Sequence, residues 1–218
     1  MIVLYSGTPG SGKSLHAAKV TYEWLIYSHK NVIANFPINR ELLKYEPREL
    51  KKAKKDPSYQ PKKRRCGRFF CFQDEHMTPD NLIKYAKKFH TKNKESQTLL
   101  IIDECCSDNF FNNRTWQNKG RNSWVSFFRQ HRKLGFEIIL ISQSDKLLDR
   151  AMRAFIEYEV KHRKANNFKG LGKFLGFVNG GSLFFAVKYW YGVREKVDVE
   201  TFNYKKMWGD FYDTYKVF

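Results

Sequence analysis

"IVLYSGTPGSGKSLHAAK", residues 2–19, runs from four apolar residues through a turn with three glycines into a stretch with helical spacing. The turn has the spacing G-x-x-x-x-G-K-[ST], and a strand before it and a helix after it are the context that a phosphate-binding loop requires. The stretch therefore predicts a P-loop. Its candidate nucleotide-binding residues are Gly7, Thr8, Pro9, Gly10, Ser11, Gly12, Lys13, Ser14 and Leu15.

Each residue type in this loop suits a polyphosphate. Glycine allows the backbone to approach the ligand closely, and successive N–H groups together with the start of the following helix form a positive nest for an anion. We expect Lys13 to reach the outer phosphates of ATP and Ser14 to be a Mg²⁺ ligand. A glycine-rich turn without a ligand is the alternative, but it does not explain the lysine and serine that follow the last glycine.

The rest of the chain predicts an α/β fold. Strand-like runs at 31–36, 69–73, 99–102 and 136–143 alternate with helix-like runs, one of which follows the N-cap Thr78 and Pro79. This alternation predicts a mostly parallel sheet with helices on both faces. Ligands of such sheets bind at the carboxyl ends of the strands.

Two of these strands end in residues suited to phosphoryl transfer. Asp103 and Glu104 follow the strand at 99–102, and Gln143 ends the run at 136–143. We expect Asp103 to hold Mg²⁺ through water opposite Ser14, Glu104 to polarise the attacking water, and Gln143 to contact the γ-phosphate or that water. The alternatives are an acidic pair that caps a strand and an ordinary polar strand end.

"NSWVSFFRQHRKLG", residues 122–135, predicts a helix with one buried face, because its apolar positions recur at i, i+3, i+4 and i+7. Those positions are Trp124, Phe127, Phe128 and His131. The opposite face carries Arg129, Arg132 and Lys133, of which Arg132 is our first candidate for a catalytic cation that reaches the nucleotide of a neighbouring subunit. The alternative is a solvated helix face.

The composition favours anionic partners. Among 218 residues, 40 Lys and Arg face 22 Asp and Glu, a formal charge of +18, while 42% hydrophobic residues suffice for one sizeable core. Residues 40–68 hold twelve basic and four acidic residues and predict an exposed insertion with a little helix at 42–55. Single-stranded DNA and an anionic membrane surface are the expected partners, against the alternative of a solvated basic loop.

The cysteines and apolar runs exclude several classes of protein. Cys66, Cys71, Cys105 and Cys106 are too few for a secreted disulfide framework and indicate reduced thiols in a cytoplasm, and adjacent cysteines diverge too much to favour a zinc site. The apolar run at 174–187 is too short for the roughly 20 residues of a spanning helix and predicts a β-hairpin around Asn-Gly-Gly-Ser. With no signal peptide before the P-loop, we expect a cytoplasmic chain with no transmembrane segment.

Several of these motifs resemble one family. The P-loop, "LLIIDE", "FFNNR" and above all "FFRQHRKLGFEIILISQSDKLLDRAMRAFIEYEVKHRK" are similar to the zonular occludens toxin (Zot) family of filamentous-phage assembly ATPases, and the closing "YDTYKVF" is also similar. The resemblance covers most of residues 1–168. It implies a P-loop ATPase of the additional-strand class that works as a ring at the inner face of the membrane, with phage coat or assembly proteins as partners.

The resemblance also implies residue roles and domain limits. It matches Lys13 and Ser14 to the Walker-A pair, Asp103 and Glu104 to the Walker-B pair, and Gln143 to a sensor-like glutamine; Arg132, Arg150 and Arg153 match basic positions. We expect an ATPase domain at 1–168 and a C-terminal hairpin and tail at 169–218 packed on it. Well-known members of the Zot family carry a transmembrane helix and an extracytoplasmic tail, which we do not find in this chain.

Three other functions remain as alternatives. A DNA-translocating or packaging ATPase of the related ring-forming class predicts the same site and differs in what stimulates hydrolysis. A small-molecule kinase shares the loop "GTPGSGKS" but does not usually carry an Asp-Glu pair at the end of a separate strand. A binding module with a structural nucleotide does not need the complete set of Lys13, Ser14, Asp103 and Glu104.

Overall fold

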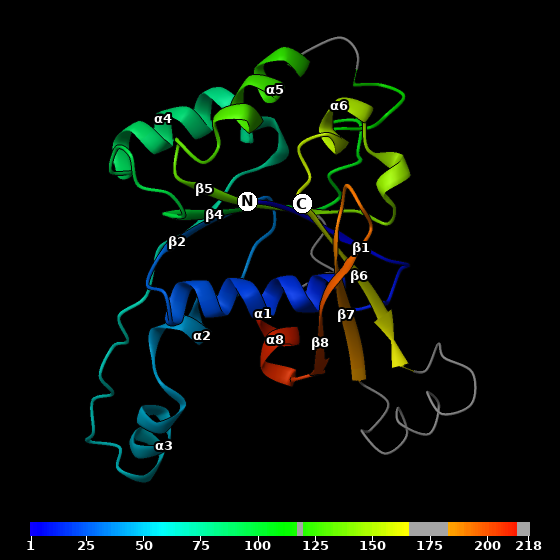
Figure 1. The fold of residues 1–218 in the computed structure, drawn as a ribbon. Coiled ribbons are helices and arrows are strands. Elements are labelled where there is room, and N and C mark those ends of the chain that lie inside the picture. Colours follow the sequence, from blue (N-terminus) through cyan, green and yellow to red (C-terminus); the bar gives the residue numbers. More distant parts are fainter. Residues whose placement is uncertain (117–119, 166–182, 213–218) are drawn as a thin grey trace.

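The computed structural model describes residues 1–116, 120–165 and 183–212, and these form an eight-stranded sheet with helices on both faces (Figure 1). The strand order is β3-β2-β4-β5-β1-β6-β7-β8, parallel from β3 to β6 and antiparallel from β6 to β8. The strands are β1 (Ile2–Ser6), β2 (Asn31–Ala34), β3 (Phe69–Cys71), β4 (Thr98–Ile102), β5 (Phe136–Ile141), β6 (Tyr158–Lys164), β7 (Leu183–Trp190) and β8 (Lys196–Asn203). The predicted α/β class with a mostly parallel sheet is confirmed.

The order of the central strands positions the site. β5 lies between β1, which leads into the P-loop, and β4, which leads to Asp103. Their register aligns Leu4 with Leu140 and Leu140 with Ile102. One strand inserted between these two is the arrangement of the additional-strand class, and it brings all three carboxyl ends to one edge.

Each face of the sheet has its own apolar core. Val3 and Tyr5 of β1 pack with α1 (Lys13–Ile26) and α8 (Lys206–Phe211) on one face. Ile2 and Leu4 pack on the other with α4 (Pro79–Phe89) and α5 (Arg121–Gln130). Burial of both faces explains the continuous apolar runs in the central strands.

The helix start predicted at Thr78 and the predicted core residues both lie on the second face of the sheet. Thr78 Oγ1 accepts a hydrogen bond from Asn81 N at 3.4 Å and caps α4. On α5, Trp124 and Phe128 stack with ring centroids 5.3 Å apart, and Phe127 is also buried, as is His131 at the C-cap. The apolar stripe is core, as its spacing predicted.

The basic insertion contains two helices, α2 (Glu41–Lys44) and α3 (Pro47–Lys55), where the sequence predicted one helical stretch. The break lies at Tyr45 and Glu46, which are both extended. A residue before proline disfavours the helical region, so Pro47 starts a new helix. α3 buries no residue, and Figure 1 shows it projecting from the domain.

The C-terminal strands differ in detail from the expectation. The turn predicted at Asn-Gly-Gly-Ser lies outside the described residues, and the hairpin that the structure describes is β7 with β8, joined at 191–195. Both strands extend the central sheet through the pairing of β6 with β7. In the described ranges, no helix has the length and apolarity needed to cross a bilayer.

Substitution of Gly67 tests the packing of the strand next to the insertion. Gly67 N donates to Leu25 O at 2.8 Å, and a Cβ at this position would lie 1.8 Å from Lys30 O, a backbone atom that cannot move freely. Gly67→Ala should lower the free energy of unfolding by about 1–3 kcal/mol in urea titration. Gly192→Ala, with no atom within 4 Å of the added Cβ, is the control and should change it little. Equal stability of the two variants would contradict this packing.

Candidate nucleotide-binding site

The P-loop connects β1 to α1 at the carboxyl edge of the sheet, and its glycines are required by geometry. Gly7, Gly10 and Gly12 have φ angles of 141°, 72° and 97°. A Cβ on Gly7 would lie 2.6 Å from His162 O, and one on Gly12 would lie 2.6 Å from the Phe184 ring. Both positions therefore need glycine for backbone conformation and for close approach.

The start of α1 is suited to an anion. Gly12 is the N-cap, no side chain caps the helix, and the first turn has no acidic residue. The first N–H groups of a helix have no partner within it, and they carry the positive end of its dipole. Ser11 Oγ is also buried without a hydrogen-bond partner in the described part of the chain. These unpaired donors fit a bound phosphate group.

Lys13 is held inside the loop. Its Nζ donates to Gly7 O at 2.7 Å and to Thr8 O at 3.1 Å. Burial lowers the pKa of the Lys13 ammonium group, and the nearby carboxylate of Asp103 acts in the opposite direction. A phosphate would be a charged acceptor in place of two neutral carbonyls.

Asp103 is fixed just beyond β4 by a neighbouring side chain. Asp103 N donates to Asn35 Oδ1 at 2.7 Å, and Asn35 Nδ2 donates to Asp103 O at 3.0 Å. Asn35 Nδ2 also donates to Asp74 Oδ1 at 3.0 Å. The Asp103 carboxylate accepts from Glu104 N at 2.8 Å and from Tyr212 Oη at 2.5 Å.

Glu104 and Gln143 lie at the same edge with exposed side chains. Glu104 has a left-handed φ of 48°, which is uncommon for a residue other than glycine and marks the sharp turn after β4. Gln143 O accepts from Gly7 N at 3.3 Å, so the end of β5 touches the P-loop through its backbone. The structure thus brings Lys13, Asp103 and these two residues to one edge.

Arg132 lies elsewhere. Its guanidinium group donates to Glu157 Oε2 at 2.7 Å, just before β6 and close to the amino group of Met1. Arg132 therefore lies at the amino ends of the parallel strands, whereas the P-loop lies at their carboxyl ends. The five residues of β1 put about 16 Å between the two. Arg150 and Arg153 bound the short helix α6 (Arg150–Arg153), which follows the end of β5 through the 3₁₀ helix η2 (Asp145–Leu147).

A buried polar network next to the P-loop links β1, α1, β6 and β8. His16 Nδ1 and His162 Nε2 are 2.8 Å apart, and His162 Nδ1 lies 3.2 Å from Ser6 O. Burial lowers the pKa of His162 to about 3, which keeps that imidazole neutral. Glu200 of β8 pairs with His16 at 3.3 Å and with Lys19, and the hydrogen bond from His16 is the main cause that lowers its pKa to about 2.

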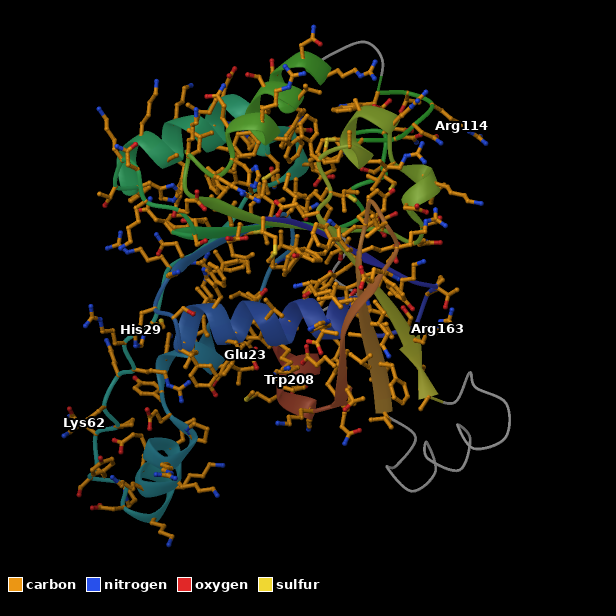
Figure 2. The ribbon with its side chains drawn as sticks, in the orientation of Figure 1. Glu23, His29, Lys62, Arg114, Arg163 and Trp208 are labelled. Atoms are coloured by element: carbon orange, nitrogen blue, oxygen red, sulfur yellow. The ribbon has the colours of Figure 1, made fainter. Side chains whose placement is uncertain are left out.

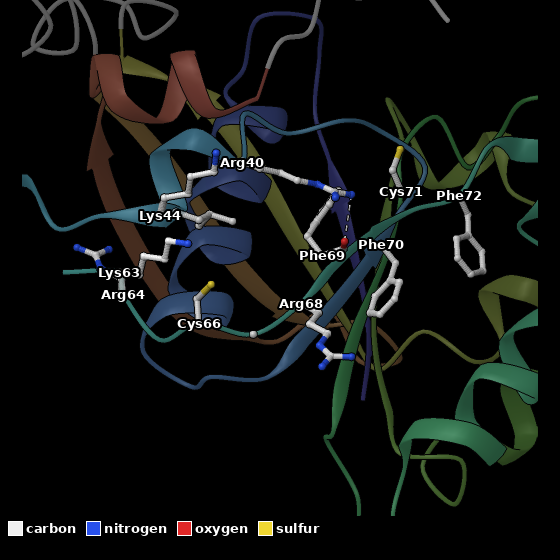
Figure 3. Close-up of a pocket in the computed structure, with 12 residues that line it drawn as sticks. Arg40, Lys44, Lys63, Arg64, Cys66, Arg68, Phe69, Phe70, Cys71 and Phe72 are labelled. Atoms are coloured by element: carbon white, nitrogen blue, oxygen red, sulfur yellow. Dashed lines mark hydrogen bonds between the residues drawn. The ribbon is translucent and has the colours of Figure 1, made fainter. Parts of the chain in front are cut away.

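A basic cleft lies between the insertion and the sheet, near the outer strand β3 (Figure 3). Its volume is about 580 Å³, and five cationic side chains line it: Arg40, Lys44, Lys63, Arg64 and Arg68. Arg40 donates to Phe69 O at 3.3 Å and so caps a carbonyl at the sheet edge. Arg64 donates to Tyr22 Oη at 2.7 Å, which anchors the insertion on α1.

Comparison with known proteins identifies the family. Residues 1–175 match the family profile described as zonular occludens toxin (Zot). The chain belongs to the Zot family. It is 29% identical to the Gene 1 protein of Escherichia phage If1 over 107 residues, 48% of this chain, and 33% identical to the Gene 1 protein of Salmonella phage IKe over 109 residues, 49% of this chain. The matches cover 30% and 29% of those relatives, so the chain spans less than a third of their length.

Solved structures show the same fold. The N-terminal domain of zonular occludens toxin from Neisseria meningitidis has a TM-score of 0.54 and 19% identity, with 97% of this chain and 98% of that chain covered. The genome packaging NTPase B204 from Sulfolobus turreted icosahedral virus 2, in complex with ATP-gammaS, has a TM-score of 0.51 and 16% identity, with 92% and 95% covered. At these identities the likeness establishes the P-loop NTPase fold of this Zot-family chain.

The sequence analysis missed several residues of the site. Asn35 and Glu200 come from separate segments, and no local motif marks them. His162 lies in the stretch ending "VKHRK", which the family resemblance had included without assigning this residue a role. Tyr212 stands in "YDTYKVF", a stretch that the family resemblance had already included without assigning it a role. The four cysteines are free thiols, and no group of three or more His, Cys, Asp or Glu side chains in the described residues is arranged to hold a metal.

Proposed function

We propose that this chain binds ATP with Mg²⁺ at the P-loop and hydrolyses the ATP, releasing its γ-phosphate. The observation that carries the proposal is the meeting of Lys13, the uncapped start of α1 and Asp103 at one sheet edge. A P-loop metal is held by few protein groups because the phosphates supply other oxygens, so a hydroxyl and one carboxylate are a sufficient set.

Each residue has a distinct role in this proposal. Lys13 leaves the carbonyls of Gly7 and Thr8 and pairs with the outer phosphates. Ser14 contributes a hydroxyl ligand, and Asp103 orients a water of the metal. Bound Mg²⁺ neutralises charge that develops on the phosphates. Glu104 polarises the attacking water, and Gln143 contacts that water or the γ-phosphate.

Two substitutions separate binding from hydrolysis. Lys13→Ala should abolish binding of a fluorescent ATP analogue, because it removes the cation that meets the phosphates. Glu104→Gln should still bind the analogue but release phosphate about 10²- to 10⁴-fold more slowly, the usual contribution of a general base. Glu75→Gln, an exposed carboxylate outside the site, is the control. Turnover of Glu104→Gln at the parent rate would remove Glu104 from this role.

We further propose that hydrolysis drives assembly and export of filamentous phage at the inner face of the host membrane, together with coat or assembly proteins. Membership of the Zot family supports this proposal. A DNA-translocating or packaging ATPase is the second candidate, favoured by the fold shared with B204 and by the basic surface. Stimulation of hydrolysis by coat protein at a membrane supports the first, and stimulation by free DNA supports the second.

The position of Arg132 bears on the proposed ring. Its side chain is 53% exposed at the edge opposite the P-loop, so a catalytic contact with a nucleotide has to be made in a neighbouring subunit. A cation supplied in this way contributes a factor of about 10³ to 10⁵ in rate. Arg150, at the start of α6 beyond the end of β5, is the second candidate.

Mixing of inactive subunits tests a cation supplied in trans. Arg132→Ala and Lys13→Ala subunits should each be inactive alone, and mixed rings should regain phosphate release at interfaces that join an intact loop to an intact arginine. Arg150→Ala mixed with Lys13→Ala is the parallel experiment. Light scattering verifies that the Arg132→Ala and Lys13→Ala subunits assemble together. If they do and phosphate release does not recover, Arg132 has only the structural role of its ion pair with Glu157.

The basic insertion is the proposed contact with single-stranded DNA. Lys62, Lys63 and Arg65 are exposed, whereas Arg64 is bound to Tyr22. Figure 2 shows Lys62 pointing outward far from the sheet. Neutralised phosphates release counterions, so binding should weaken steeply with salt.

Charge reversal of Lys62, Lys63 and Arg65 to Glu should lower DNA affinity and reduce the salt slope in fluorescence anisotropy by about 2, roughly 0.7 for each lost phosphate contact. The control reverses Lys84, Lys87 and Lys88, three exposed cations of α4, and so changes the net charge equally. Equal losses in the two triple variants would indicate attraction by net charge alone. Affinity that does not change with salt would leave an anionic membrane surface as the partner.

A further inference from the structure

The last described segment of the chain is docked against the nucleotide site. α8 packs on α1, with Trp208 and Phe211 buried. Phe211 meets the Tyr22 ring edge to face at 5.7 Å, and Phe211 O accepts from Asn39 N at 2.9 Å. Figure 1 shows α8 directly beside α1, on the face of the sheet opposite α4 and α5. The end of α8 is therefore anchored by both packing and a backbone hydrogen bond.

Tyr212 extends from this anchor into the metal site. Its backbone leaves the helical region, and its side chain is only 9% exposed, with the ring 4.4 Å from that of Phe36. Its hydroxyl donates to Asp103 Oδ2 at 2.5 Å, and Ser14 is among the side chains near the same phenol. Tyr212 thus engages a carboxylate oxygen of the residue proposed to orient a water of Mg²⁺.

The chemistry of this contact makes it strong. The Tyr212 hydroxyl is a neutral donor, and its acceptor is a carboxylate oxygen. Hydrogen bonds to a charged acceptor are shorter and stronger than neutral ones.

The metal and the Tyr212 phenol would depend on the same acceptor, the Asp103 carboxylate. A Mg²⁺ ion demands near-ideal octahedral geometry with oxygens at 2.0–2.1 Å and retains several waters. A Mg²⁺ ion held by the Ser14 hydroxyl would need Asp103 to accept from one of its waters, and that carboxylate accepts from the Tyr212 hydroxyl in this structure. The metal-bound water and the phenol would therefore compete for Asp103.

We propose that Tyr212 is a gate on the metal site, closed in this structure, which has to withdraw from Asp103 before Mg²⁺ and nucleotide bind. This inference rests on the proposed function and adds a means of regulating it. Withdrawal moves the end of α8, and α8 follows β8, whose Glu200 is tied to His16 and Lys19 of α1. Nucleotide binding is thereby coupled to the C-terminal strands.

Substitution of Tyr212 by Phe tests the gate with little disturbance of packing, because the ring against Phe36 is kept and only the donor is lost. Binding of fluorescent ATPγS is measured while Mg²⁺ is titrated. The variant should need about tenfold less Mg²⁺ for half-saturation, since the competing charged hydrogen bond is absent. Tyr204→Phe, whose parent side chain is 49% exposed in the same segment, is the control and should match the wild type.

Hydrogen exchange gives a second readout that does not depend on turnover. In the wild type, amides of residues 206–212 should exchange faster with Mg²⁺ and ATPγS than with ATPγS in EDTA. An unchanged Mg²⁺ requirement in Tyr212→Phe overturns the gate. A higher requirement also overturns it and makes Tyr212 a positioning residue that holds a metal-bound water. If neither protein binds ATPγS, the proposed function itself fails, and the gate fails with it.

Discussion

Parallel pairing of β1 with β5 and of β5 with β4 sets Leu4, Leu140 and Ile102 in one row across the sheet, and the nucleotide site depends on this register. The chain leaves all three strands at the same edge, so Lys13, Gln143 and Asp103 meet there although 130 positions separate Lys13 from Gln143. A shift of one residue in any of the three strands would exchange its two faces and move its end away from the others. The apolar cores on both faces oppose such a shift.

The loop itself is held from two sides by parts of the chain that lie far from it in sequence. The carbonyl of His162 approaches Gly7, and Phe184 of β7 approaches Gly12. A side chain at either glycine would have to displace backbone or an aromatic ring. The strands β6 and β7 therefore shape the P-loop directly, and the C-terminal hairpin belongs to the structure of the site as well as to the sheet.

Much of this arrangement was predictable from local sequence. The P-loop spacing, the apolar strand before Asp103 and the stripe of Trp124, Phe127 and Phe128 each depend on periodicity or on neighbours a few residues away. Asn35, Tyr212 and the pair His16 and His162 were not predictable in this way, because their partners are 68, 109 and 146 residues distant. The break between α2 and α3 did have a local signal in Pro47, which the sequence analysis did not use.

The central claim is that Mg²⁺ and ATP bind where Lys13, Ser14 and Asp103 converge. A crystal structure with Mg²⁺ and ATPγS tests this most directly. We expect the phosphates on the N–H groups at the start of α1, Lys13 Nζ moved from the carbonyls of Gly7 and Thr8 to the outer phosphates, and the metal on the Ser14 hydroxyl with Asp103 oriented toward its water. A nucleotide bound away from this loop, or a metal without Ser14 in its shell, would contradict the account.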